Sequence, residues 1–61
     1  MKYEVESIGE NGFSMNFNKH ENDFSPENVR KQFEEFTKNM NINRTRVFED
    51  DNNVSIGVIL A

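Results

Sequence analysis

The sequence predicts a two-layer α+β fold with the order ββαββ, in which one helix covers one face of a four-stranded, mostly antiparallel sheet. Three observations predict it. Apolar and polar residues alternate in two segments near the N-terminus, and again in two segments at the C-terminal end. Between these pairs, apolar residues recur every three or four positions, which is typical of an amphipathic helix. Each element has one apolar face, so we expect all of them to share one core.

The first hairpin is expected to join strands near residues 3–7 and 13–17. A two-residue turn at residues 11–12 would place two glutamates on the phenylalanine face, whereas a three-residue loop over residues 10–12 keeps the apolar residues together. We therefore expect the second register, which pairs Val5 with Phe17 and requires Gly12 in the left-handed conformation. The inward positions are then Tyr3, Val5, Ser7, Phe13, Met15 and Phe17.

A helix is predicted to begin at Pro26. Ser25 is a favourable N-cap, and proline suits the first helical position because its missing N–H costs nothing there. Phe24 and Val29 are placed for a hydrophobic staple across this start. The apolar stripe expected to pack on the sheet consists of Val29, Phe33, Phe36 and Met40.

The pattern in the last third of the sequence predicts a second hairpin, with its turn in the polar residues 50–53. The turn closes on residues 51–52 or on residues 52–53, and both closures stay open because a shift of two residues keeps the same faces together. The strand after the helix should run parallel to the strand before it, with another strand between them and a right-handed crossover. The inward positions of this hairpin are Thr45, Val47, Val54, Ile56, Val58 and Leu60.

The composition indicates one small domain, residues 1–61, with a thin core. There is no cysteine, which excludes a disulfide framework and a thiolate zinc site. The net charge of −4 argues against a non-specific grip on nucleic acid or on a membrane surface. Neither a membrane-spanning run nor a secretory signal is visible, so we expect a cytoplasmic location.

No set of residues has the spacing of a catalytic or cofactor site. His20 is the only histidine, and two nearby acids supply too few ligands for a metal, so we interpret it as a solvated loop residue. The acidic residues 49–53 fail the calcium-loop pattern, because Ser55 and Ala61 stand where glycine and glutamate are required. We therefore interpret this segment as a polar turn, and expect no enzyme activity, no metal and no cofactor.

The strongest functional indication is a set of apolar residues out of phase with the core. If Val47 faces the helix, Phe48 faces away from it, and the same alternation turns Ile59 and Ile8 outward. Isolated apolar residues on a surface are ordinary, but three on the uncovered face of the sheet favour a patch for another protein or for a second copy. Phe48, Ile59 and Ile8 are therefore the predicted partner-binding residues.

The stretch from Phe48 to Val54 resembles the C-terminal hairpin of the Dmd antitoxins of T-even phages in its pattern Phe-x-Asp-Asp-x-x-Val. The resemblance covers this hairpin alone. It implies a small phage accessory protein that binds and neutralises a host toxin in the host cytoplasm. The function we expect is a non-catalytic protein-binding module, a phage-encoded inhibitor or modulator of a host enzyme or toxin. The alternative is a homo-oligomeric structural or assembly component.

Overall fold

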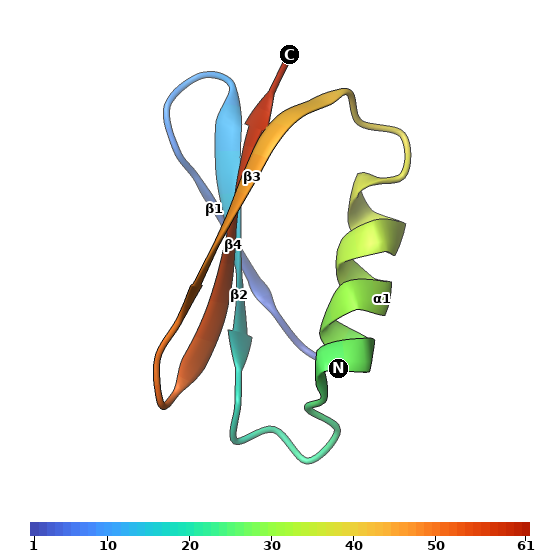
Figure 1. Cartoon of the computed structure of the whole chain (residues 1–61), viewed down its shortest axis with the longest axis vertical. Helices are drawn as coiled ribbons and strands as arrows, with labels where there is room; N and C mark the ends of the chain where they lie inside the picture. The colour runs from blue at the N-terminus through green and yellow to red at the C-terminus, as the bar shows by residue number, and fades with distance from the viewer.

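The computed structural model, which describes residues 1–61, confirms the predicted α+β class and element order. Its elements are β1 (Glu4–Ser7), β2 (Gly12–Asn18), α1 (Pro26–Thr37), β3 (Ile42–Glu49) and β4 (Asn53–Leu60). The strands form one antiparallel sheet with the order β1-β2-β4-β3, and α1 lies on one side of it (Figure 1). β4 therefore lies between β2 and β3, as expected from the parallel direction of those two strands.

The start of α1 follows the sequence signals. Ser25 has an extended backbone, and its side-chain Oγ accepts a hydrogen bond from the backbone N–H of Asn28 at 3.0 Å. This bond satisfies one of the free N–H groups in the first turn, and Pro26 occupies the first helical position. The predicted N-terminus of the helix is confirmed.

The core is built on the two central strands. Met15, Phe17 and Val58 are completely buried. Both β1 and β3 are edge strands, and almost all of their residues are exposed. The six buried apolar residues are Phe13, Met15, Phe17, Val29, Ile56 and Val58.

The helix leans toward the β1 and β2 side of the sheet. Several residues expected to face the core are nevertheless exposed, namely Val5 (46%) on the edge strand β1, Phe36 (37%), Met40 and Val47. The ring of Phe36 lies 5.8 Å from that of Tyr3 and 5.7 Å from that of Phe13, in edge-to-face arrangements. Val47, on the opposite edge, is consequently left 62% exposed instead of buried. Met40 lies beyond the end of α1 and is also exposed, so the predicted apolar stripe is only partly buried.

Thr37 is a buried helix residue that the apolar pattern missed. It is the one buried polar side chain, and its hydroxyl donates a hydrogen bond to the backbone carbonyl of Phe33 at 2.7 Å. This bond to the preceding turn satisfies the hydroxyl, so the methyl group is buried without leaving a polar group unpaired.

The first hairpin differs from the expected register by two residues. Val5 pairs with Met15 instead of Phe17, and Ile8 N–H donates to the carbonyl of Gly12 at 2.9 Å. The positive φ of 66° belongs to Gly9, and Gly12 is an ordinary strand residue. The reason is tertiary: Gly12 pairs with Ile59 of β4, and this pairing holds it in the sheet.

The second hairpin closes on residues 51–52, one of the two closures left open. Asp50 N–H donates to the carbonyl of Asn53 at 3.0 Å, and Val47 pairs with Ile56. A register shift lies between Ile42 and Arg44, where β3 carries a bulge.

Glycine is required at position 12 because a side chain would not fit there, and not because the backbone has a positive φ. A Cβ at this position would lie 2.8 Å from the carbonyl oxygen of Ile8 and 3.0 Å from that of Val58. Gly12→Ala should therefore lower the free energy of unfolding by about 1–3 kcal/mol, the usual cost of overpacking. Denaturant unfolding checks this against Gly57→Ala in the neighbouring strand, where the nearest atom lies 3.7 Å away and the change should be neutral or stabilising. Equal effects of the two substitutions would contradict the packing of Gly12.

Two methionines test the position of the core. Met15 is fully buried and Met40 is 37% exposed. Met15→Ala should lower the free energy of unfolding by about 2–5 kcal/mol, because it leaves a cavity between sheet and helix. Met40→Ala is the matched control and should cost less than about 1 kcal/mol. Similar losses for both in thermal unfolding would place the core elsewhere.

Candidate interaction surface

The face of the sheet opposite α1 has a centre of small side chains. Ser14 pairs with Gly57, and Asn16 with Ser55, across the β2–β4 ladder. Ser55 Oγ donates a hydrogen bond to Oδ1 of Asn16. The larger side chains of this face therefore lie on the strands and loops that surround this centre.

The predicted residues Phe48, Ile59 and Ile8 meet around one hollow at the Ile8 end of this face. The hollow has a volume of about 450 Å³. Phe48 is 56% exposed, Ile8 50% and Ile59 38%, so all three are available for contact. We call these three residues the outer patch.

Two arginines border the outer patch. The guanidinium carbon of Arg46 lies 5.0 Å from the centre of the Phe48 ring, which is a cation–π contact. Arg44 pairs with Ile59 across the β3–β4 ladder and lines the same hollow. The outer patch thus combines an exposed aromatic ring with positive charge, although the chain as a whole carries −4.

A second surface, on the helix side, was not predicted. An apolar groove of about 330 Å³ separates α1 from β3, and Phe24, Phe33, Thr45 and Val47 are among the residues that line it. We call it the inner groove. The inner groove exists because α1 leans away from β3. It was not predicted because alternation along a strand shows which face of the sheet a side chain is on, but not whether a helix covers that face.

The loop after β2 is tied to the β3–β4 turn. Lys19 N–H donates to the carbonyl of Asn52 at 2.8 Å, and its Nζ lies 2.5 Å from Oε2 of Glu49. The ring Nε2 of His20 is 3.0 Å from Oδ1 of Asn52. His20 therefore has a structural partner, which its sequence neighbours did not indicate.

Asp50 stabilises the turn between β3 and β4. Its Oδ1 accepts hydrogen bonds from the backbone N–H groups of Asn52 and Asn53, both at 2.7 Å. These bonds favour the carboxylate and hold the pKa of Asp50 below its ordinary value, and Lys19 contributes in the same direction. The polar-turn interpretation is confirmed.

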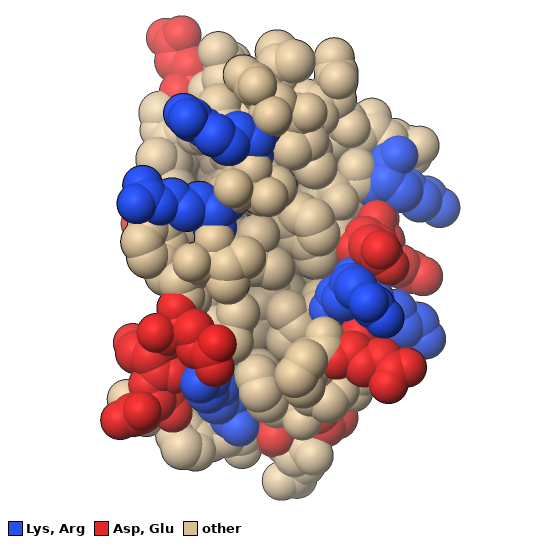
Figure 2. Space-filling model, viewed as in Figure 1, with Lys and Arg blue, Asp and Glu red and all other residues tan.

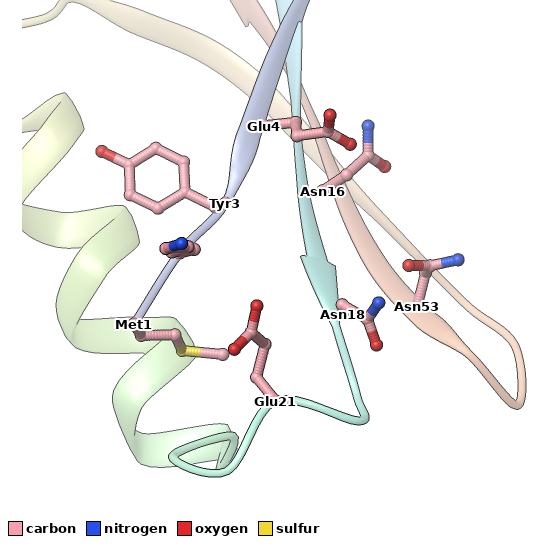
Figure 3. A pocket seen from close by; sticks show the side chains of 8 residues that line it. Met1, Tyr3, Glu4, Asn16, Asn18, Glu21 and Asn53 are labelled. Atoms are coloured by element: carbon pink, nitrogen blue, oxygen red, sulfur yellow. The ribbon is translucent and has the colours of Figure 1, made fainter.

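A third hollow is lined mainly by polar residues. It lies beside the start of β1, has a volume of about 530 Å³, and is lined mainly by charged and amide side chains (Figure 3). Its two carboxylates, Glu4 and Glu21, come from opposite sides of the opening (Figure 3). No three His, Cys, Asp or Glu side chains in the protein gather closely enough to hold a metal ion. We therefore assign no chemistry to this hollow.

Comparison with protein-family models, with curated proteins and with solved structures finds no match to this chain. The helix α1 is too short and too polar to cross a lipid bilayer.

Asp50 gives a pH-dependent prediction. Because its pKa is lower in the folded protein than in the unfolded chain, its stabilising effect is complete above the unfolded value of 3.8 and is lost as the pH falls through the folded value. Asp50→Asn should therefore show a smaller loss of stability between pH 5 and pH 2 than the parent. Asp50→Ala, which removes the acceptor altogether, should be the least stable of the three at pH 5. Urea unfolding at both pH values measures this, and identical pH dependence of parent and Asp50→Asn would contradict it.

Proposed function

We propose that the chain is a small non-catalytic protein-binding module and that the outer patch is its contact surface. The observation that carries the proposal is the convergence of Phe48, Ile59 and Ile8 on one hollow while all three remain exposed. Interface energy is concentrated in a few large residues that fit into pockets, with aromatic residues and arginine prominent among them. Phe48 with Arg46 above its ring has this character.

The charges around the outer patch indicate the kind of protein it would bind. Arg44 and Arg46 are two of the three arginines in the chain, and both line the hollow. A partner with an apolar group for the hollow and acidic side chains around it would complement this surface. Such a contact needs no catalytic residue from this chain.

The specific form of the proposal is a phage-encoded inhibitor or modulator of a host enzyme or toxin, acting in the host cytoplasm. The resemblance of the β3–β4 hairpin to the Dmd antitoxins supports this form, since Phe48 lies in that hairpin. The alternative is a homo-oligomeric structural or assembly component, which would use the same outer patch between copies. Replacing Ile59 and Ile8 by Ser separates the two, because only an oligomer built through the outer patch would then lose mass in solution.

Replacing Phe48 and Ile59 together by Ser tests the proposal. Both residues lie outside the core, so the variant should remain folded by circular dichroism. A partner is first captured from host lysate on the immobilised parent chain. The affinity of this partner is then measured for the parent chain and for the double variant. Loss of two central contact residues should weaken binding about 30-fold or more, which corresponds to about 2 kcal/mol.

Met40→Ser is the matched control, because Met40 is as exposed as Ile59 and lies outside the outer patch. It should bind the partner like the parent. A folded double variant that binds with parental affinity would remove the outer patch from the interface.

A further inference from the structure

The two edges of the sheet differ in how open they are to another strand. β1 has four residues, and two of them are glutamates. β3 has eight residues, and its bulge lies between the first and the third of them, Ile42 and Arg44. From this bulge to the turn at residues 51–52, residues 44–49 of β3 and the following Asp50, whose N–H still bonds to Asn53, form an uninterrupted edge. An edge of this length is a template for strand addition unless something blocks it.

The hydrogen bonds of the β3–β4 hairpin determine which backbone groups point outward. Asp50 bonds to Asn53, and bonding alternates along an antiparallel ladder. Arg44, Arg46 and Phe48 therefore direct their backbone groups toward β4. The N–H and C=O groups of the intervening residues, Thr45, Val47 and Glu49, point away from the sheet.

The free edge has opposite charges at its two ends. Arg44 and Arg46 lie in the first half of β3, whereas Glu49, Asp50 and Asp51 lie at its end. Figure 2 shows basic groups on the upper part of this side, acidic groups with a basic group beside them near the β3–β4 turn below, and an uncharged band between this side and the charged surface of α1. Glu49 is already paired with Lys19, which leaves Asp50 and Asp51 as the free acidic groups of this end. An antiparallel copy of the same edge would bring basic and acidic ends together.

We propose that β3 pairs antiparallel with β3 of a second copy of this chain, with Val47 opposite Val47. This register uses all of residues 44–50 and none of the bulge. It places Arg44 opposite Asp50 of the other copy, and Arg46 opposite Phe48 of the other copy. Both pairs lie on the outer face, where opposite charges and cation–π contacts stabilise a ladder.

Neighbouring registers are less favourable. Moving the centre by one residue toward the N-terminus sets Arg46 opposite Arg46, and like charges directly opposite destabilise a ladder. Moving it by one residue toward the C-terminus sets Arg46 opposite Asp50, but it leaves Arg44 opposite the turn residue Asn52 and shortens the pairing to residues 46–50. Only the register centred on Val47 gives both arginines a partner over residues 44–50.

Pairing also covers the exposed apolar side of β3. Val47 is 62% exposed and lines the inner groove, together with Phe33 of α1. In the paired sheet the two Val47 side chains meet on the helix side, and the inner grooves of the two copies join across the interface. The pairing uses the strand edge together with Arg44, Arg46 and Phe48, whereas Ile59 and Ile8 of the outer patch lie on β4 and before β2, outside the pairing. Substitutions at Ile59 and Ile8 therefore separate this inference from the proposed function.

The mass of the full chain in solution is the first test. Sedimentation equilibrium should give twice the monomer mass of 7.2 kDa at high concentration. Val47→Lys should give a folded monomer, because an inward charge on an edge strand blocks further pairing. Val5→Lys, at the equivalent exposed position on β1, is the matched control and should remain dimeric. A parent chain that stays monomeric at millimolar concentration overturns the proposal, including the case in which it binds an extended peptide instead.

The charge pairing is tested in the same assay. Arg44→Glu sets a glutamate opposite Asp50 of the other copy and should weaken dimerisation about tenfold, whereas Arg44→Lys should change it little. Raising the salt concentration should weaken the parent dimer, because it screens the attraction between Arg44 and Asp50, and should strengthen the Arg44→Glu dimer, because it screens repulsion there. A dimer that tolerates Arg44→Glu but dissociates when Ile59 and Ile8 are replaced by Ser is held together by the outer patch. This outcome overturns pairing through the β3 edge.

Cysteine crosslinking tests the register, because the chain has no cysteine of its own. Val47→Cys places two thiols opposite each other across the pair, within the range of about 4.4–6.8 Å between Cα atoms that a disulfide spans. Oxidised glutathione should link this variant into covalent dimers. Thr45→Cys is the matched control and should not crosslink, whereas Thr45→Cys combined with Glu49→Cys should. A dimer that crosslinks through Thr45→Cys alone, or not through Val47→Cys, overturns the register.

Discussion

The position of α1 over the sheet is the constraint on which the rest of the structure depends. A helix of twelve residues cannot cover four strands, and the contacts of Phe36 with Tyr3 and Phe13 fix it over the β1 and β2 side. The apolar residues under it, on β2 and β4, become the core. β3 is held mainly by its ladder with β4 and by the loop that ties Lys19 to Glu49.

This arrangement leaves β3 open on three sides. Its outer face carries Phe48 with Arg44 and Arg46, its inner face carries Val47 beside the inner groove, and its edge has unpaired backbone groups. The opposite edge, β1, is short and acidic. A small domain with one thin core is stabilised by anything that binds its folded state, so contacts along β3 would add stability as well as function.

Alternation and capping signals determined most of the fold in advance. Ser25 and Pro26 marked the start of the helix, and the period of two placed Phe48, Ile59 and Ile8 on the outer face. The register of the first hairpin was not predictable in this way, because a slip of two residues leaves every side chain on the same face. The pairing of Gly12 with β4 decides between the two registers. The exposure of Val47 and the inner groove depend on the lean of α1. That lean results from aromatic packing between distant residues, which spacing along the chain does not encode.

Amide hydrogen exchange along β3, measured by NMR as a function of protein concentration, tests the central claim most directly. In dilute solution the amides of Thr45, Val47 and Glu49 should exchange quickly, and those of Arg44, Arg46 and Phe48 slowly, because only the second set bonds to β4. As the concentration rises, Thr45, Val47 and Glu49 should become protected while the amides of β1 do not. Slow exchange of all six amides in dilute solution, or exchange at Val47 that is independent of concentration, would contradict an open β3 that pairs with a second copy.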